Sequence, residues 1–86
     1  MSVRILVAED EALIRMDLVE MLQGAGYEVV AQATNGQEAI DLATEHKPDL
    51  AILDVKMPVL DGISAAEKII EIAPVLMLTA SLKKSW

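Results

Sequence analysis

Short apolar runs alternate along this chain with segments in which apolar residues recur every three or four positions. The runs predict β-strands, and the recurring positions predict amphipathic helices. Four strands are expected, at residues 4–8, 28–33, 50–53 and 74–79, with a helix in each of the three segments between them. Strands that alternate with helices form parallel sheets with right-handed crossovers, so this order predicts an α/β domain with helices on both faces of the sheet.

Acidic and hydroxyl residues lie at the ends of three predicted strands. Glu9 and Asp10 follow the first strand, Asp54 follows the third, and Thr79 ends the fourth. The carboxyl ends of parallel strands lie along one edge of a sheet, where ligands bind, so we expect these side chains to meet there. Carboxylates brought together repel one another. A hard cation such as Mg²⁺, which prefers oxygen ligands, relieves that repulsion.

These acidic residues also have a simpler interpretation, as helix caps or solvated loop ends. We favour that interpretation for Glu11, which lies just before the first predicted helix. It does not suit Asp54, because this residue directly follows four apolar strand residues and precedes Val55-Lys56-Met57-Pro58. A joint metal-binding role is therefore the preferred interpretation for Glu9, Asp10 and Asp54.

The composition excludes several classes of function. A formal net charge of −7 repels a phosphate backbone, which makes direct nucleic-acid binding by this segment unfavourable. The absence of cysteine excludes disulfides and thiol catalysis. No apolar run approaches the roughly 20 residues of a membrane-spanning helix. The sequence therefore predicts a soluble, cytoplasmic domain without a membrane partner.

Four short segments together resemble the receiver domain of bacterial response regulators. They are Glu9-Asp10, Asp54-Val55-Lys56-Met57-Pro58, Asp61-Gly62 and Leu78-Thr79-Ala80, each at the end of a predicted strand or in the loop that follows it. The likeness covers residues 3–80. It implies a flavodoxin-like parallel sheet with strand order 2-1-3-4, and a signalling domain of two-component systems rather than an enzyme.

The resemblance also implies a role for each residue of the acidic edge. Asp54 would be the phosphoacceptor, taking a phosphoryl group from a phosphohistidine of a sensor histidine kinase. Asp10 and Asp54 would bind Mg²⁺ directly, Glu9 would act through water, and the backbone carbonyl of Lys56 would complete the protein ligands. Thr79 would be the switch hydroxyl that turns toward the bound phosphoryl group.

A narrower likeness points to receivers of the ANTAR type. It is carried by residues 8–16, by Lys47-Pro48-Asp49 and by Ile72-Ala73-Pro74-Val75. Regulators of this type carry an RNA-binding antiterminator module after the receiver. The resemblance therefore implies an output module that acts on RNA and lies outside this chain.

The likeness ends early, because a complete receiver has five strands and five helices. We therefore expect residues 1–80 to form a partial receiver domain and residues 81–86 to be a tail foreign to the family, produced by a frameshift or by a designed truncation. Lys83 and Lys84 come too early in the topology to replace the family's phosphate-binding lysine, so we expect weak or absent phosphorylation. The fourth strand would be an exposed edge, which predicts a homodimer or larger oligomer.

Two other functions remain as alternatives. A phosphatase of the haloacid dehalogenase type also uses an aspartate at a strand end, but it needs a second aspartate two residues later, where this chain has Lys56. The other alternative is an inert receiver fold that never takes phosphate and acts only as a self-associating interaction module.

Overall fold

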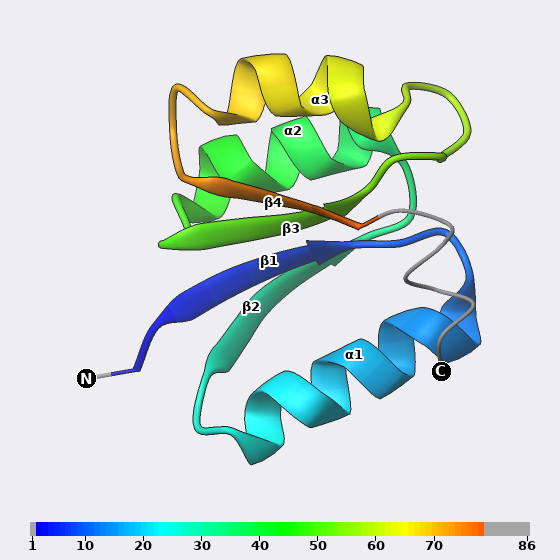
Figure 1. Ribbon diagram of the computed structural model, residues 1–86. Helices are drawn as coiled ribbons and strands as arrows, with labels where there is room; N and C mark the ends of the chain where they lie inside the picture. Colours follow the sequence, from blue (N-terminus) through cyan, green and yellow to red (C-terminus); the bar gives the residue numbers. More distant parts are fainter. Residues whose placement is uncertain (1, 79–86) are drawn as a thin grey trace.

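The computed structural model describes residues 2–78 of the chain (Figure 1). Strands and helices alternate throughout, as the hydrophobic pattern predicts. In chain order the elements are β1 (Arg4–Ala8), α1 (Ala12–Gly24), β2 (Glu28–Ala33), α2 (Gly36–His46), β3 (Leu50–Asp54), α3 (Gly62–Ile69) and β4 (Val75–Leu78).

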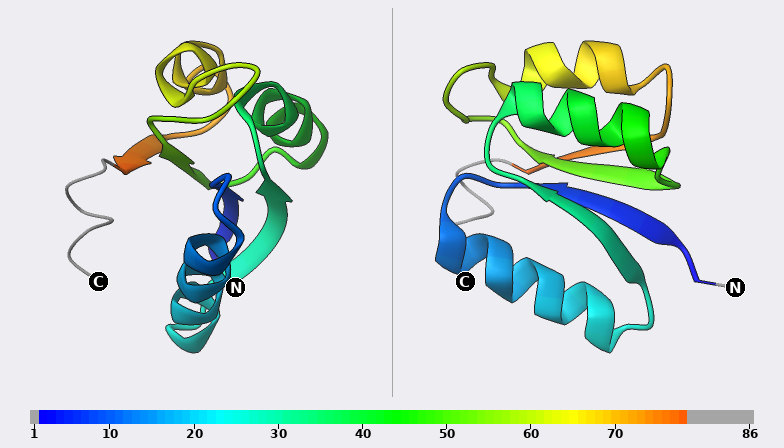
Figure 2. Two further views of the ribbon diagram at one scale, coloured as in Figure 1. Left: turned by 90° about the vertical axis from the view of Figure 1, so that its right-hand side faces the viewer. Right: turned by 180° about the vertical axis from the view of Figure 1, so that it is seen from behind.

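The four strands form one parallel sheet in the order β2-β1-β3-β4. Helices α2 and α3 lie side by side on one face of this sheet, and α1 lies on the other (Figures 1 and 2). The predicted flavodoxin-like architecture with strand order 2-1-3-4 is therefore confirmed. None of the helices within residues 2–78 is long and apolar enough to cross a membrane.

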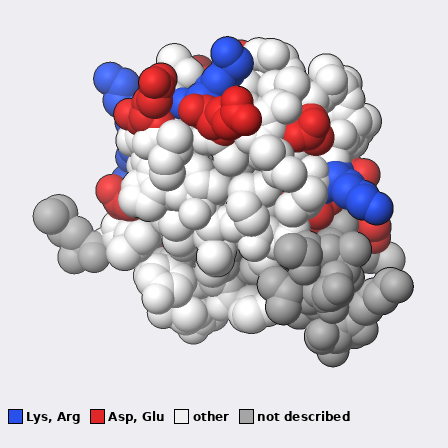
Figure 3. Space-filling model, turned by 45° about the horizontal axis from the view of Figure 1, so that its top comes forward, with Lys and Arg blue, Asp and Glu red and all other residues white. Residues whose placement is uncertain are grey.

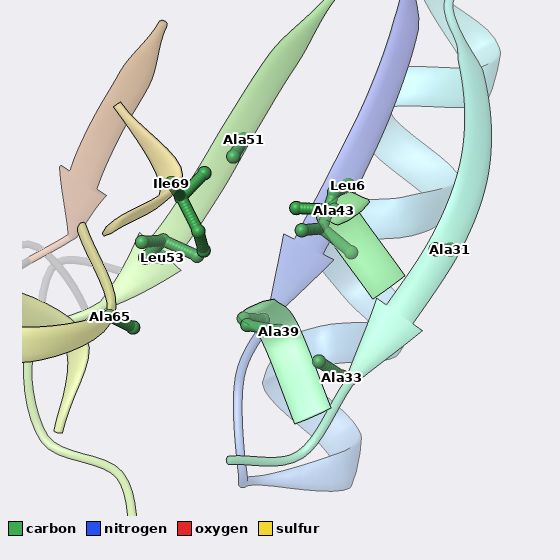
Figure 4. Close-up of a cluster of buried hydrophobic side chains, with 10 residues drawn as sticks. Leu6, Ala31, Ala33, Ala39, Ala43, Ala51, Leu53, Ala65 and Ile69 are labelled. Carbon is green, nitrogen blue, oxygen red and sulfur yellow. The ribbon is translucent and has the colours of Figure 1, made fainter. Parts of the chain in front are cut away.

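The larger core cluster lies between the sheet and the α2–α3 layer. Small side chains dominate it, which lets the helices approach the strands closely (Figure 4). Its fully or nearly fully buried members are Leu6, Ala8, Ala31, Ala33, Ala39, Ala43, Ala51, Leu53, Ala65 and Ile69. Helix α1 packs on the opposite face, where Leu18 and Val19 meet Ile5 and Val7. Burial on both faces explains why the strands are almost continuously apolar.

Two of the three helices begin with a side-chain cap. Asn35 caps α2, its Oδ1 accepting a hydrogen bond of 2.8 Å from the Glu38 amide, and Asp61 caps α3 by the same contact with Ser64. Glu11 occupies the N-cap position of α1 as expected. Within the described part of the chain its side chain is exposed and forms no capping hydrogen bond, so of the two expected roles, cap or solvated loop end, Glu11 fits the second.

Strand β4 begins one residue later than the sequence predicted. Within the described residues it covers Val75–Leu78, whereas the predicted strand started at residue 74. Pro74 has no amide hydrogen for a ladder hydrogen bond, although its carbonyl accepts one from Ala51 at 2.9 Å. Thr79 and the predicted tail at residues 81–86 lie outside the described residues.

Candidate functional site

Three carboxylates meet at the C-terminal edge of the sheet. Strands β1 and β3 are neighbours, with Ala8 opposite Leu53, so the residues that follow these two positions are brought together. One carboxylate oxygen from each of Glu9, Asp10 and Asp54 lies within 4.8 Å of the other two. The structure thus brings together the three acidic residues that the sequence places at strand ends.

The three carboxylates differ in their exposure to solvent. Glu9 and Asp54 are almost completely buried, at 0% and 1% exposure, whereas Asp10 is exposed. The Glu9 Oε2 accepts a hydrogen bond of 3.0 Å from the amide of Glu11, which fixes the turn between β1 and α1. Two carboxylates buried so close together favour a cation beside them, because a buried charge is costly unless it is compensated.

The spacing of the oxygens suits a small divalent ion. Ligand oxygens about 2.1 Å from Mg²⁺ in an octahedron lie roughly 3 to 4.2 Å from one another. A limit of 4.8 Å between the carboxylate oxygens is slightly wider than this range. Direct ligation by two carboxylates and contact through water for the third therefore fit the arrangement, and an all-oxygen site is the kind that Mg²⁺ prefers.

Backbone hydrogen bonds hold the loop after β3 near both of its ends. At its start, the Val55 amide donates to the Leu78 carbonyl at 3.1 Å, and the Val55 carbonyl accepts from the Gly62 amide at 2.9 Å. Near its end, the Leu60 carbonyl accepts from the Gly36 amide at 2.8 Å. These bonds join the loop that follows Asp54 to β4, to α3 and to the first residue of α2.

This loop also contains a strained residue. Val59 has a φ angle of +67° and is 83% exposed, and the Leu60 amide donates to the Pro58 carbonyl at 2.7 Å across it. A β-branched residue with positive φ is a genuine outlier, and a turn of this kind is strained. Sequence reasoning missed Val59, because nothing in its residue type signals a positive φ.

An open pocket of ≈660 Å³ lies beside the acidic edge. Asp10 and Lys56 contribute charged groups to its lining, and Met57, Pro58 and Ile63 contribute apolar surface. Lys56 is exposed and therefore accessible from this pocket. A molecule that approaches the three carboxylates from this side meets Asp10 first, since Glu9 and Asp54 are buried.

Fold and site together define a doubly wound α/β domain whose acidic residues meet at the carboxyl ends of its central strands. The family model of the response regulator receiver domain matches residues 5–85. The chain belongs to this family, and it is the receiver domain of a two-component response regulator. The resemblance drawn from the sequence is confirmed, and the family match excludes the haloacid dehalogenase-type alternative.

Curated relatives give the same result. The transcriptional regulatory protein PdtaR of Mycobacterium tuberculosis is 63% identical over 79 residues, which are 90% of this chain and 38% of that protein. PdtaR is an ANTAR-type regulator, so the narrower likeness is confirmed as well. The chemotaxis protein CheY of Thermotoga maritima is 43% identical over 74 residues, covering 86% of this chain and 62% of CheY. The chain thus spans well under half of the length of PdtaR.

Solved structures share the fold. The response regulator domain of Thermotoga maritima CheB matches with a TM-score of 0.87 and 37% identity, over 93% of this chain and 62% of that one. CheY in the CheX-CheY-BeF3-Mg+2 complex from Borrelia burgdorferi matches with a TM-score of 0.86 and 28% identity, over 91% of this chain and 62% of that one.

Proposed function

We propose that Asp54 is the phosphoacceptor of this receiver domain and that Glu9, Asp10 and Asp54 hold the Mg²⁺ ion on which the transfer depends. The observation that carries the proposal is the meeting of three carboxylate oxygens within 4.8 Å at the ends of β1 and β3. Receiver domains bind Mg²⁺ at such an acidic cluster. The CheX-CheY-BeF3-Mg+2 complex from Borrelia burgdorferi supports the same assignment.

The chain's own residues position the reacting groups. A carboxylate oxygen of Asp54 forms a bond to phosphorus while the bond from phosphorus to the donor's imidazole nitrogen breaks, and the imidazole takes up a proton. Because Asp54 ends a buried strand, its side chain is held in place before the donor arrives. Bound Mg²⁺ supplies positive charge that neutralises the transferring group.

The remaining expected contributors lie around this centre. The backbone carbonyl of Lys56 is the fourth protein ligand in the proposal, two residues after Asp54 and beside the pocket that Asp10 also lines. Thr79 is the proposed switch hydroxyl, and it directly follows β4, which pairs with β3. The phosphodonor is a sensor histidine kinase, and the output is an RNA-binding module, by analogy with ANTAR-type regulators.

Phosphoryl labelling tests the proposal. We expect acetyl phosphate with Mg²⁺ to add one phosphoryl group to a small fraction of the molecules, in keeping with the weak phosphorylation expected from the sequence, as seen by intact-protein mass spectrometry. Asp54→Asn should abolish the addition. Asp41→Asn is the matched control, because Asp41 is an exposed acid on α2, away from the acidic edge. Labelling that survives in Asp54→Asn, or that is lost in Asp41→Asn, contradicts the assignment.

A self-associating module is the second candidate function, and β4 favours it. Within residues 2–78 this strand pairs with β3 alone, and Leu76 is 52% exposed. Helix α1 packs mainly against β1 and β2, so it leaves β4 largely uncovered. The surface that faces the viewer around β4 shows few charged groups (Figure 3). An apolar sheet edge of this kind pairs readily with a second copy of the chain.

A further inference from the structure

Arg15 reaches back from α1 to the turn that carries two of the three acidic residues. Its Nη1 donates a hydrogen bond of 2.8 Å to the backbone carbonyl of Glu9, six residues earlier in the chain, and the contact is partly buried. This bond lies outside the helical hydrogen-bond pattern, in which the Arg15 amide donates to the Glu11 carbonyl at 2.9 Å. The arginine thus ties the second turn of α1 to the end of β1.

Among the described residues, hydrogen bonds hold Glu9 through its amide, its carboxylate and its carbonyl. Its amide donates to the Ala33 carbonyl at 3.0 Å, its carboxylate accepts from the Glu11 amide at 3.0 Å, and its carbonyl accepts from Arg15. The first contact fixes Glu9 to β2, and the other two fix the direction in which the chain leaves β1. Asp10 lies between Glu9 and Glu11, which are joined by a hydrogen bond. The orientation of Asp10 therefore depends on the contacts that hold Glu9.

We propose that Arg15 is a positioning residue for the metal site: its hydrogen bond to the Glu9 carbonyl sets the turn that directs the Glu9 and Asp10 carboxylates toward Asp54. The inference rests on the proposed function, since it takes these three residues as the Mg²⁺ ligands. Groups that orient metal ligands without touching the metal commonly change metal affinity about 10-fold or more when they are removed.

Removing Arg15 has two opposite effects on the affinity for Mg²⁺, one from its charge and one from its hydrogen bond. A binding measurement can therefore test the proposal. Loss of the positive charge of Arg15 removes its repulsion of a nearby cation, which strengthens cation binding. Loss of the positioning contact weakens binding, by about 10-fold. The sign of the change therefore tells which effect dominates, and the proposal requires weaker binding.

The experiment is a calorimetric Mg²⁺ titration of the full 86-residue chain and its variants. We expect Arg15→Met to raise the Mg²⁺ dissociation constant about 10-fold. Arg15→Lys, which keeps the charge but loses the planar fork, should give an intermediate rise. Arg4→Met is the matched control, because the Arg4 Nη1 also donates to a backbone carbonyl, that of Lys47 at 3.2 Å, but at the opposite edge of the sheet. Its dissociation constant should equal that of the parent.

A second measurement needs no metal. Hydrogen exchange of the Glu11 amide, which is bonded to the Glu9 carboxylate, reports the order of the turn directly. We expect Arg15→Met to accelerate this exchange about 10-fold, while the Ala31 amide within β2 keeps its parent rate. If Arg15→Met does not fold, Arg15→Lys carries both measurements.

The outcomes separate the inference from the function on which it rests. Unchanged or tighter Mg²⁺ binding in a folded Arg15→Met, or an unchanged Glu11 exchange rate, overturns the positioning role. A parent chain that binds no Mg²⁺ overturns the proposed function, and the exchange rate of the Glu11 amide then still decides whether Arg15 orders the turn.

Discussion

The backbone of Gly62 lies directly against the carbonyl group of Asp54. A Cβ atom at position 62 would overlap that carbonyl and come within 3.1 Å of the Met77 Cε. The first residue of α3 is therefore packed onto the last residue of β3, and any side chain there would push the acceptor strand out of place. The motif Asp61-Gly62 serves two purposes at once, since Asp61 caps the helix and Gly62 permits the contact.

Gly62→Ala should destabilise the domain by about 1–3 kcal/mol, the usual cost of forcing extra atoms into a packed site. Gly24→Ala is the control, because a Cβ at Gly24, within α1, meets nothing within 4 Å. In a helix alanine is more favourable than glycine, so this control should stabilise by up to about 1 kcal/mol. Urea unfolding of both variants measures the difference, and equal midpoints would contradict the close packing.

Val59→Asn should stabilise the domain by about 1 kcal/mol. The φ angle of +67° is costly for a β-branched residue, and asparagine tolerates it much better. Because Val59 is 83% exposed, the exchange removes little buried apolar surface. Val59→Ile keeps the branching and should leave stability unchanged. A lower melting temperature in Val59→Asn than in Val59→Ile would show that the turn carries no strain.

Asp10→Asn should have opposite effects with and without Mg²⁺. Without metal it removes a charge that lies within 4.8 Å of two other carboxylates, which should raise stability by about 1 kcal/mol. With Mg²⁺ at a hundred times its dissociation constant the parent should gain about 2.7 kcal/mol, and the variant much less. Thermal unfolding with and without Mg²⁺ measures both effects. Asp41→Asn, the control on α2, should respond to Mg²⁺ as the parent does.

Leu76→Lys should reduce self-association through β4. A lysine on an edge strand opposes pairing with another chain, since its charge would be buried in the joined sheet. Leu13→Lys is the control, because Leu13 is 77% exposed on α1, away from this edge. We expect light scattering to give a mass that rises with concentration for the parent and for Leu13→Lys, but not for Leu76→Lys. A monomeric parent at all concentrations would refute the association.

The hydrophobic pattern alone predicted the alternation of strands and helices and the meeting of the acidic residues, for one physical reason, whereas the strand order was implied by the resemblance to receiver domains. Continuous apolar runs such as residues 50–53 identify buried parallel strands, and the residues that follow parallel strands share one edge. Hydrophobic periodicity and strand ends are local features of the chain. They therefore located Glu9, Asp10 and Asp54 without any knowledge of packing.

Contacts between distant segments could not be predicted in this way. The approach of the Leu60 carbonyl to Gly36 depends on the path of a loop 24 residues later, so no local pattern indicates it. The bond from Arg15 to Glu9 likewise depends on the angle at which α1 leaves the sheet. Glu11 was expected to be a helix cap or a solvated loop end; it is exposed at the N-cap position and its side chain forms no capping hydrogen bond, so it fits the second description.

The hydrogen bond between the Gly36 amide and the Leu60 carbonyl connects the corner between β2 and α2 to the loop that follows Asp54. The position of this corner should therefore respond to modification of Asp54. The backbones of Gly36 and Leu60 are in direct contact, with no side chain between them. If the loop shifts when Asp54 is modified, the corner between β2 and α2 therefore shifts as well. A fluorophore attached at exposed Gln37 would sense that movement from outside the pocket. The chain lacks cysteine, so a single engineered cysteine at this position gives unambiguous labelling.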